Sequence, residues 1–211
     1  MYCKQQLFLF LAAALLAAGL VSPTLAQSSE TPKVEVGGHV SVIRLLDLEI
    51  PIFPPADGPI TGYRREYTTN AGFGGRVGYN LTNQVALEGE LNYFPQESGR
   101  TKRNGLQGLF GAKAGWRGER VGVFGKARPG FLRYEEPLVC VTAPCPNRTV
   151  TQFALDLGGV LEFYPSRHLV TRFDVGDTLI RGERLTGALP LITKDVFRHN
   201  LQMSAGVGFR F

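Results

Sequence analysis

The stretch that decides the fold lies at the end of the chain and reads Leu201-Gln202-Met203-Ser204-Ala205-Gly206-Val207-Gly208-Phe209-Arg210-Phe211. Every odd-numbered position in it is apolar, and every even-numbered position is polar or glycine. Because successive side chains of a β-strand point to opposite faces, this alternation predicts a strand with one apolar and one polar face. An amphipathic helix would instead repeat its apolar residues every three or four positions.

The same alternation recurs along the chain, and turn-type residues bound it each time. Eight segments show it: 34–43, 71–81, 84–94, 106–117, 121–133, 151–164, 168–177 and 198–211. Short turns at 82–83, 118–120 and 165–167 alternate with long links at 44–70, 95–105, 134–150 and 178–197. An even number of strands with short turns at one end and long loops at the other is typical of outer-membrane barrels. We therefore predict an all-β fold, an eight-stranded antiparallel up-and-down transmembrane β-barrel.

The polar face of these segments carries charges of both signs among many glycines. Its expected interior charge network comprises Arg76, Glu88, Glu90, Lys113, Lys126, Arg128, Asp156, Arg172 and Asp174. A soluble calyx would turn this face to water, where glycine is a poor strand residue. Large charges beside glycines suit the narrow lumen of an eight-stranded barrel, which side chains just fill. We expect a salt-bridged, largely occluded interior, because an unpaired buried charge costs several kcal/mol.

Neighbouring segments suggest the individual pairs. Glu88 and Glu90 are expected beside Arg76 and Lys113, Asp156 beside Lys126 and Arg128, and Arg172 beside Asp174.

The apolar face carries no charge within the cores of the segments, where each would cost about 2–4 kcal/mol in hydrocarbon. Aromatic residues gather at both ends of the segments and predict two girdles at the membrane surfaces. The inner girdle is expected to contain Tyr79, Trp116, Phe163, Tyr164, Phe209 and Phe211, and the outer one Phe73, Tyr93, Phe94, Phe131 and Phe153. Pro129 cannot donate to a strand ladder, so it is expected near the outer rim or at a bulge.

The first residues predict export. Lys4 precedes an apolar run from Leu7 to Val21, and Thr24-Leu25-Ala26 fits a small-x-small cleavage site. This arrangement predicts a signal peptide over 1–26 and a barrel domain over 27–211.

Cys140 and Cys145 are the cysteines left after cleavage, and in an exported chain they predict one small disulfide loop. A metal site would need more ligands, and we expect neither a metal nor a cofactor. The formal charge of +5 favours attraction to anionic lipid headgroups, or simply solvated loop charges, over nucleic acid.

The last segment resembles the C-terminal assembly signal of bacterial outer-membrane proteins, which ends in phenylalanine after alternating apolar residues. Phe209 and Phe211 stand at the matching positions. The chain from 27 to 211 resembles the small-barrel superfamily of the OmpA transmembrane domain and OmpX-like proteins. The resemblance implies a location in the bacterial outer membrane and a contact with the barrel-assembly machinery.

Catalysis is not expected, so we predict that the protein is not an enzyme. The chain has three histidines, and His199 and Ser204 have opposite parity, so they do not converge as a nucleophile and base would. The leading interpretation is a non-catalytic barrel for envelope integrity or surface adhesion, with an external ligand or surface partner bound through the long loops. A narrow porin-like channel for small solutes is the alternative, and a lipid-modifying enzyme is the third class.

Overall fold

The computed structural model describes residues 32–52, 62–95, 97–98, 101–102, 104–137, 147–185 and 193–211. The strands are β1 (Val34–Ile52), β2 (Gly62–Asn80), β3 (Val85–Phe94), β4 (Glu97–Ser98), β5 (Thr101–Lys102), β6 (Gly105–Arg117), β7 (Val121–Pro137), β8 (Asn147–Phe163), β9 (Leu169–Leu185) and β10 (Thr193–Arg210). Among these residues, no helix has the length and apolar character needed to cross a membrane.

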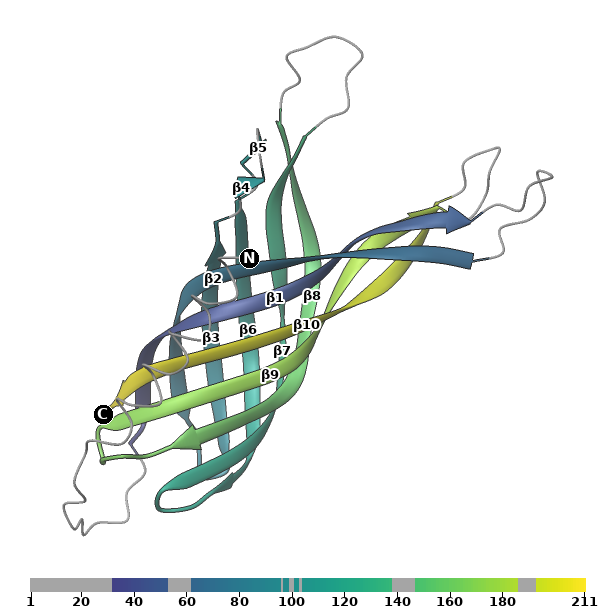
Figure 1. Cartoon of the computed structure of the whole chain (residues 1–211). Coiled ribbons are helices and arrows are strands. Elements are labelled where there is room, and N and C mark those ends of the chain that lie inside the picture. Colours follow the sequence, from purple (N-terminus) through teal and green to yellow (C-terminus); the bar gives the residue numbers. More distant parts are fainter. Residues whose placement is uncertain are drawn as a thin grey trace.

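Eight of the strands close into one barrel in the order β1-β10-β9-β8-β7-β6-β3-β2, and neighbouring strands are antiparallel (Figure 1). The first and last strands complete the ring by pairing from Glu35↔Arg210 to Arg44↔Leu201. The predicted all-β, eight-stranded barrel is therefore confirmed. A small additional sheet, β4 with β5, lies in the 95–105 link and was not expected.

Several strands continue far beyond their predicted outer ends. β1 and β2 remain paired up to Ile52↔Gly62, although the alternation stops near residues 43 and 71. Backbone pairing does not need an apolar face, and outside the membrane both faces of a ribbon meet water. The predicted links 44–70, 134–150 and 178–197 are therefore partly strand, which corrects the sequence-based boundaries.

The outer part of the barrel separates into ribbons. Pairing between β2 and β3 begins at Phe73↔Tyr93, and pairing between β8 and β9 begins at Ala154↔Ile180. Beyond these points the β1–β2 and β9–β10 ribbons diverge from the β7–β8 ribbon, as Figure 1 shows.

Burial separates the two faces largely as predicted. Outward residues such as Phe110 and Val207 are 63% and 54% exposed, and inward ones such as Gln107 are fully buried. Phe94 and Tyr164 were assigned to the girdles, and this assignment was wrong, because both are buried. Both side chains have the parity of the lumen, and the Tyr164 hydroxyl donates to Glu162 at 2.7 Å.

Pro129 lies at a gap in a ladder. Partners between β6 and β7 run as far as Leu109↔Gly130 and resume at Ala112↔Ala127, while Pro129 keeps its partner Leu155 on β8. The register is the same on both sides of the gap, so the ladder is interrupted without the shift that a bulge produces.

Candidate functional site

The lumen of the barrel gathers the charged side chains. All nine residues of the predicted network point inward, and none is more than 7% exposed. Burying this many charges is costly unless each finds a partner, so the pairing among them decides what the site can do.

The central contact joins opposite walls. Glu88 on β3 and Arg172 on β9 stand half a turn apart in the strand order, and Arg172 Nη2 donates to Glu88 Oε2 at 2.9 Å. The second guanidinium nitrogen, Nη1, contacts the other carboxylate oxygen, so the pair is bidentate. Arg172 also holds Asp174 on its own strand through Nε and Nη2, both at 2.8 Å.

Arg128 on β7 forms a second junction. Its Nη1 donates to Glu90 at 2.6 Å, and its Nε and Nη2 donate to Asp156 at 2.9 and 2.6 Å. Lys126 adds contacts of 2.9 Å to Asp156 and 3.3 Å to Asp174. Each carboxylate in this group thus meets more than one cation or donor.

Lys113 on β6 forms the third junction, nearer the end of the barrel with the short turns. Its Nζ lies 3.2 Å from Glu88 and 3.5 Å from Glu35, and it also contacts Glu162. Arg117 continues the chain of contacts to Glu35 at 3.4 Å. Glu35, Arg117 and Glu162 were absent from the predicted network, although their parity already assigned them to the polar face.

An uncharged layer lies on the outer side of these junctions. Gln107 on β6 and Gln202 on β10 exchange two amide hydrogen bonds of 3.0 Å across the barrel. Asn92 donates to Gln107 at 2.9 Å, and the Thr178 hydroxyl donates to Gln202 at 2.8 Å. Sequence reasoning missed this layer because it searched for charge, and the inward parity was the signal that could have found it.

The expected neighbours can be compared with the structure. Arg76 was expected beside Glu88 and Glu90, and its partner in the β2–β3 ladder is Glu90, while its Nη1 lies 3.6 Å from Asp174. The pairs Lys113–Glu88, Lys126–Asp156, Arg128–Asp156 and Arg172–Asp174 were expected from sequence and are present. Contacts across the lumen depend on how the sheet curves, which neighbouring segments alone do not reveal.

The remaining predicted site residues lie elsewhere. Phe209 and Phe211 are 58% and 72% exposed at the C-terminal end of the outward face. Cys140 and Cys145 lie outside the described residues, and so does the predicted signal peptide over 1–26.

The histidines do not meet a nucleophile. His199 Nδ1 lies 2.5 Å from Asp177 on the outer surface, whereas Ser204 is buried on the inward face. His39 shares a 2.5 Å hydrogen bond with Asn92 in the lumen, and His168 is exposed at a turn. Within the described part of the chain, no group of three or more His, Cys, Asp or Glu side chains could hold a metal ion.

Comparison with known proteins agrees with this architecture. The model of the outer membrane protein beta-barrel domain family matches residues 11–211. The chain belongs to this family. The protein is accordingly a barrel of the bacterial outer membrane, in contact with its lipid. A search of curated proteins found no match.

Solved members of the wider fold have little sequence in common with this outer-membrane barrel. The outer membrane protein OprG from Pseudomonas aeruginosa matches with a TM-score of 0.57 and 12% identity, covering 86% of this chain and 96% of its own. Neisserial surface protein A matches with a TM-score of 0.52 and 13% identity, covering 84% and 97%. The outer membrane protease OmpT from Escherichia coli matches with a TM-score of 0.45 and 7% identity, covering 90% and 100%.

Proposed function

We propose that this outer-membrane barrel is non-catalytic, that ion pairs close its lumen, and that it serves envelope integrity or surface adhesion. The bidentate Glu88–Arg172 pair carries the proposal, because it joins opposite walls and neither side chain is more than 1% exposed. A hydrated ion crossing this level would have to separate two desolvated charges that are bound to each other. We therefore expect no steady passage of small solutes.

The role at the surface is supported by the ribbons beyond the membrane. The β1–β2, β7–β8 and β9–β10 pairs extend outward from a barrel that is closed and tightly cross-linked inside. Loops on a rigid scaffold are where binding residues concentrate. An external ligand or surface partner is therefore expected at the ends of these ribbons.

The non-catalytic part of the proposal rests on the histidines. A nucleophilic hydroxyl needs a base within hydrogen-bond distance and a third group that orients the base. His199 has the orienting Asp177 at 2.5 Å, but Ser204 lies on the opposite face of the strand.

Conductance in a planar lipid bilayer tests the closed lumen. The wild-type protein should give no discrete openings, and the double variant Glu88→Ala/Arg172→Ala should give openings because the cross-lumen pair is removed as a unit. The double variant Arg181→Ala/Asp195→Ala is the matched control, since it removes an exposed ion pair from the outer surface. Discrete openings of the wild-type protein would contradict the closed lumen and favour the alternative function, a narrow channel for small solutes.

Two cellular measurements separate the two surface roles. Leakage of a periplasmic enzyme from cells lacking the protein would support envelope integrity. Retention of protein-displaying cells on an external surface, with no change in leakage, would support adhesion.

Lipid A from expressing cells should be unmodified by mass, and a new species would indicate a lipid-modifying enzyme.

A further inference from the structure

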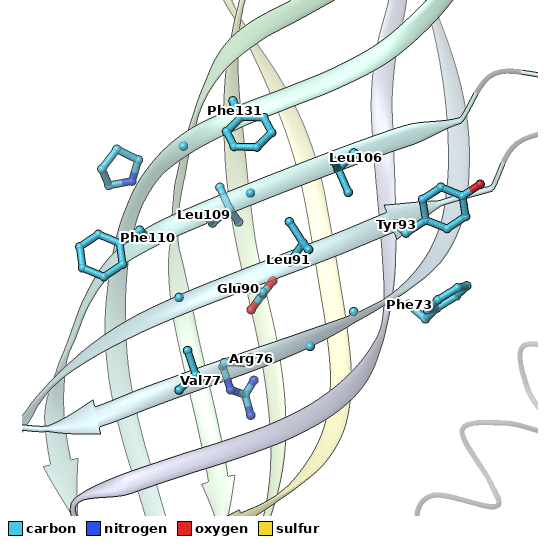
Figure 2. A pocket seen from close by; sticks show the side chains of 16 residues that line it. Phe73, Arg76, Val77, Glu90, Leu91, Tyr93, Leu106, Leu109, Phe110 and Phe131 are labelled. Carbon is cyan, nitrogen blue, oxygen red and sulfur yellow. The ribbon is translucent and has the colours of Figure 1, made fainter.

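A groove crosses the outward face of the wall formed by β2, β3, β6 and β7 (Figure 2). The groove is open along its length and has a volume of about 750 Å³, and most of its lining is apolar. Its walls are the side chains of Phe73, Val77, Leu91, Tyr93, Phe110 and Phe131. This face lies in the membrane, so the groove opens toward the hydrocarbon chains of the lipid rather than toward water.

Glycines create the groove by leaving gaps beside large side chains. Gly75 pairs with Leu91, and Gly89 pairs with Phe110. A Cβ atom at Gly75 would meet no other atom closer than 3.9 Å, and one at Gly89 none closer than 3.6 Å. A Cβ atom at either glycine would make ordinary van der Waals contacts, so the floor of the groove can accept added carbon atoms and is not a close backbone approach.

Such a gap favours one particular kind of occupant. An empty space leaves the carbon atoms that line it without contact partners, and their dispersion energy is lost. A flexible hydrocarbon chain can enter a groove of this shape and contact its floor and both walls. On a smooth part of the barrel the same chain would contact the protein on one side only.

A cation lies beside the outer end of the groove. Leu106, which lines the groove, pairs with Arg133, and Arg133 is exposed on the outward face. Guanidinium groups at the level of the headgroups complement the phosphate groups of lipids.

We propose that the groove holds an acyl chain of a phosphorylated outer-leaflet lipid and that Arg133 binds the phosphate of the same molecule. The apolar walls select the chain, and the cation selects the headgroup. The site therefore distinguishes this lipid from an uncharged one with equal chains. This proposal does not depend on whether the lumen conducts.

Native mass spectrometry of the purified barrel, released from detergent micelles with added lipid A, tests the proposal. The wild type should retain one lipid A. Gly89→Leu fills the floor and should retain about fivefold less, the factor expected when roughly ten carbon–carbon contacts are lost. Arg133→Gln should show a similar loss for lipid A but no change for dephosphorylated lipid A.

Gly159→Leu is the matched control, because Gly159 is also an outward glycine and a Cβ there would meet nothing closer than 3.9 Å. It should retain lipid A like the wild type. Added inorganic phosphate should not displace the lipid, since it has no chain for the groove.

Three results would overturn the proposal. Gly89→Leu and Arg133→Gln could both retain as much lipid A as the wild type. Gly159→Leu could lose as much as Gly89→Leu. The wild type could instead form dimers that Gly89→Leu abolishes, which would make the groove an interface between copies. If Gly89→Leu fails to show the heat-dependent gel mobility of a folded barrel, Gly75→Leu and Arg133→Gln decide the outcome.

Discussion

At the scale of single residues, Glu88 is a carboxylate that cations from three strands share, as Asp174 also is. Arg172 binds it in a bidentate manner, and Lys113 and Arg128 lie 3.2 and 3.7 Å from it. Glu88→Ala should lower the free energy of unfolding by about 3 kcal/mol, because it removes a buried carboxylate that compensates the charges of three buried cations. Urea unfolding in lipid vesicles, followed by the fluorescence of the single tryptophan, measures this change.

Glu88→Ala/Arg172→Ala should be less destabilised than the sum of its single variants, because neither charge is left behind. Asp195→Asn, which alters an exposed pair, should leave the urea midpoint unchanged. Equal effects of Glu88→Ala and Asp195→Asn would show that the lumen is well hydrated.

The fold requires glycine at position 130, because it leaves no room for a side chain there. A Cβ atom there would lie 1.9 Å from the carbonyl oxygen of Gly108, because β6 and β7 approach closely beside the gap at Pro129. Gly130→Ala should therefore yield little or no heat-modifiable barrel after refolding, since a clash with backbone costs at least about 1–3 kcal/mol. Gly125→Ala on the same strand should refold normally, because its Cβ would meet nothing closer than 3.8 Å.

At the scale of one strand, β10 records where the hydrocarbon ends. The lipid-facing residues from Leu201 to Phe209, and Phe211 just after the strand, are apolar. His199 is the next residue on this face toward the outer end of the barrel, and it is polar and paired with Asp177. Val207→Arg should lower the free energy of unfolding by about 2–4 kcal/mol, the cost of an arginine near mid-depth. His199→Arg should cost only about 0–1 kcal/mol, since it lies near the interface. Equal costs at the two positions would contradict this placement of the membrane.

Alternation predicts an element only where its two faces meet different surroundings. Along β10 one face meets lipid and the other the lumen, so the strand and its parity were predictable from the sequence. In the outer part of β2 the chain reads GYRREYTTN over 62–70, with polar residues at both odd and even positions. The sequence analysis therefore predicted the strand only from residue 71 onward.

The site shows the same limit. The inward position of Arg172 follows from parity along its own strand. Its partner Glu88 stands on the opposite wall, and that contact depends on the closure and tilt of the whole sheet.

At the scale of the whole molecule, the backbone and the side chain of the C-terminal residue are expected to have different roles, the first in folding and the second in assembly in the cell. The backbone of Phe211 pairs with Val34 through N–H···O contacts of 2.9 and 3.2 Å, while its side chain is 72% exposed. Phe211→Ala should therefore refold from urea into detergent with a free energy of unfolding within about 0.5 kcal/mol of the wild type.

In cells, the same variant should reach the outer membrane at a lower yield, because the side chain is expected to be read by the barrel-assembly machinery. Phe163→Ala is a control, since it removes an outward phenylalanine without altering the end of the chain. An unchanged cellular yield of Phe211→Ala would show that the final phenylalanine is dispensable for targeting.

The pairing of Val34 with Phe211 also means that the first and last strands of the barrel begin and end side by side. The closed ring of strands could therefore be formed by a chain that begins at another strand. A circular permutant could join these ends through a short linker and open the chain at the turn between Thr82 and Asn83. Every strand would keep its neighbours, yet the signal-like ending would move into the middle of the polypeptide. Such a molecule would keep the barrel fold but would no longer end in the residues that resemble the assembly signal. The contribution of the last strand to folding could then be measured separately from its contribution to targeting.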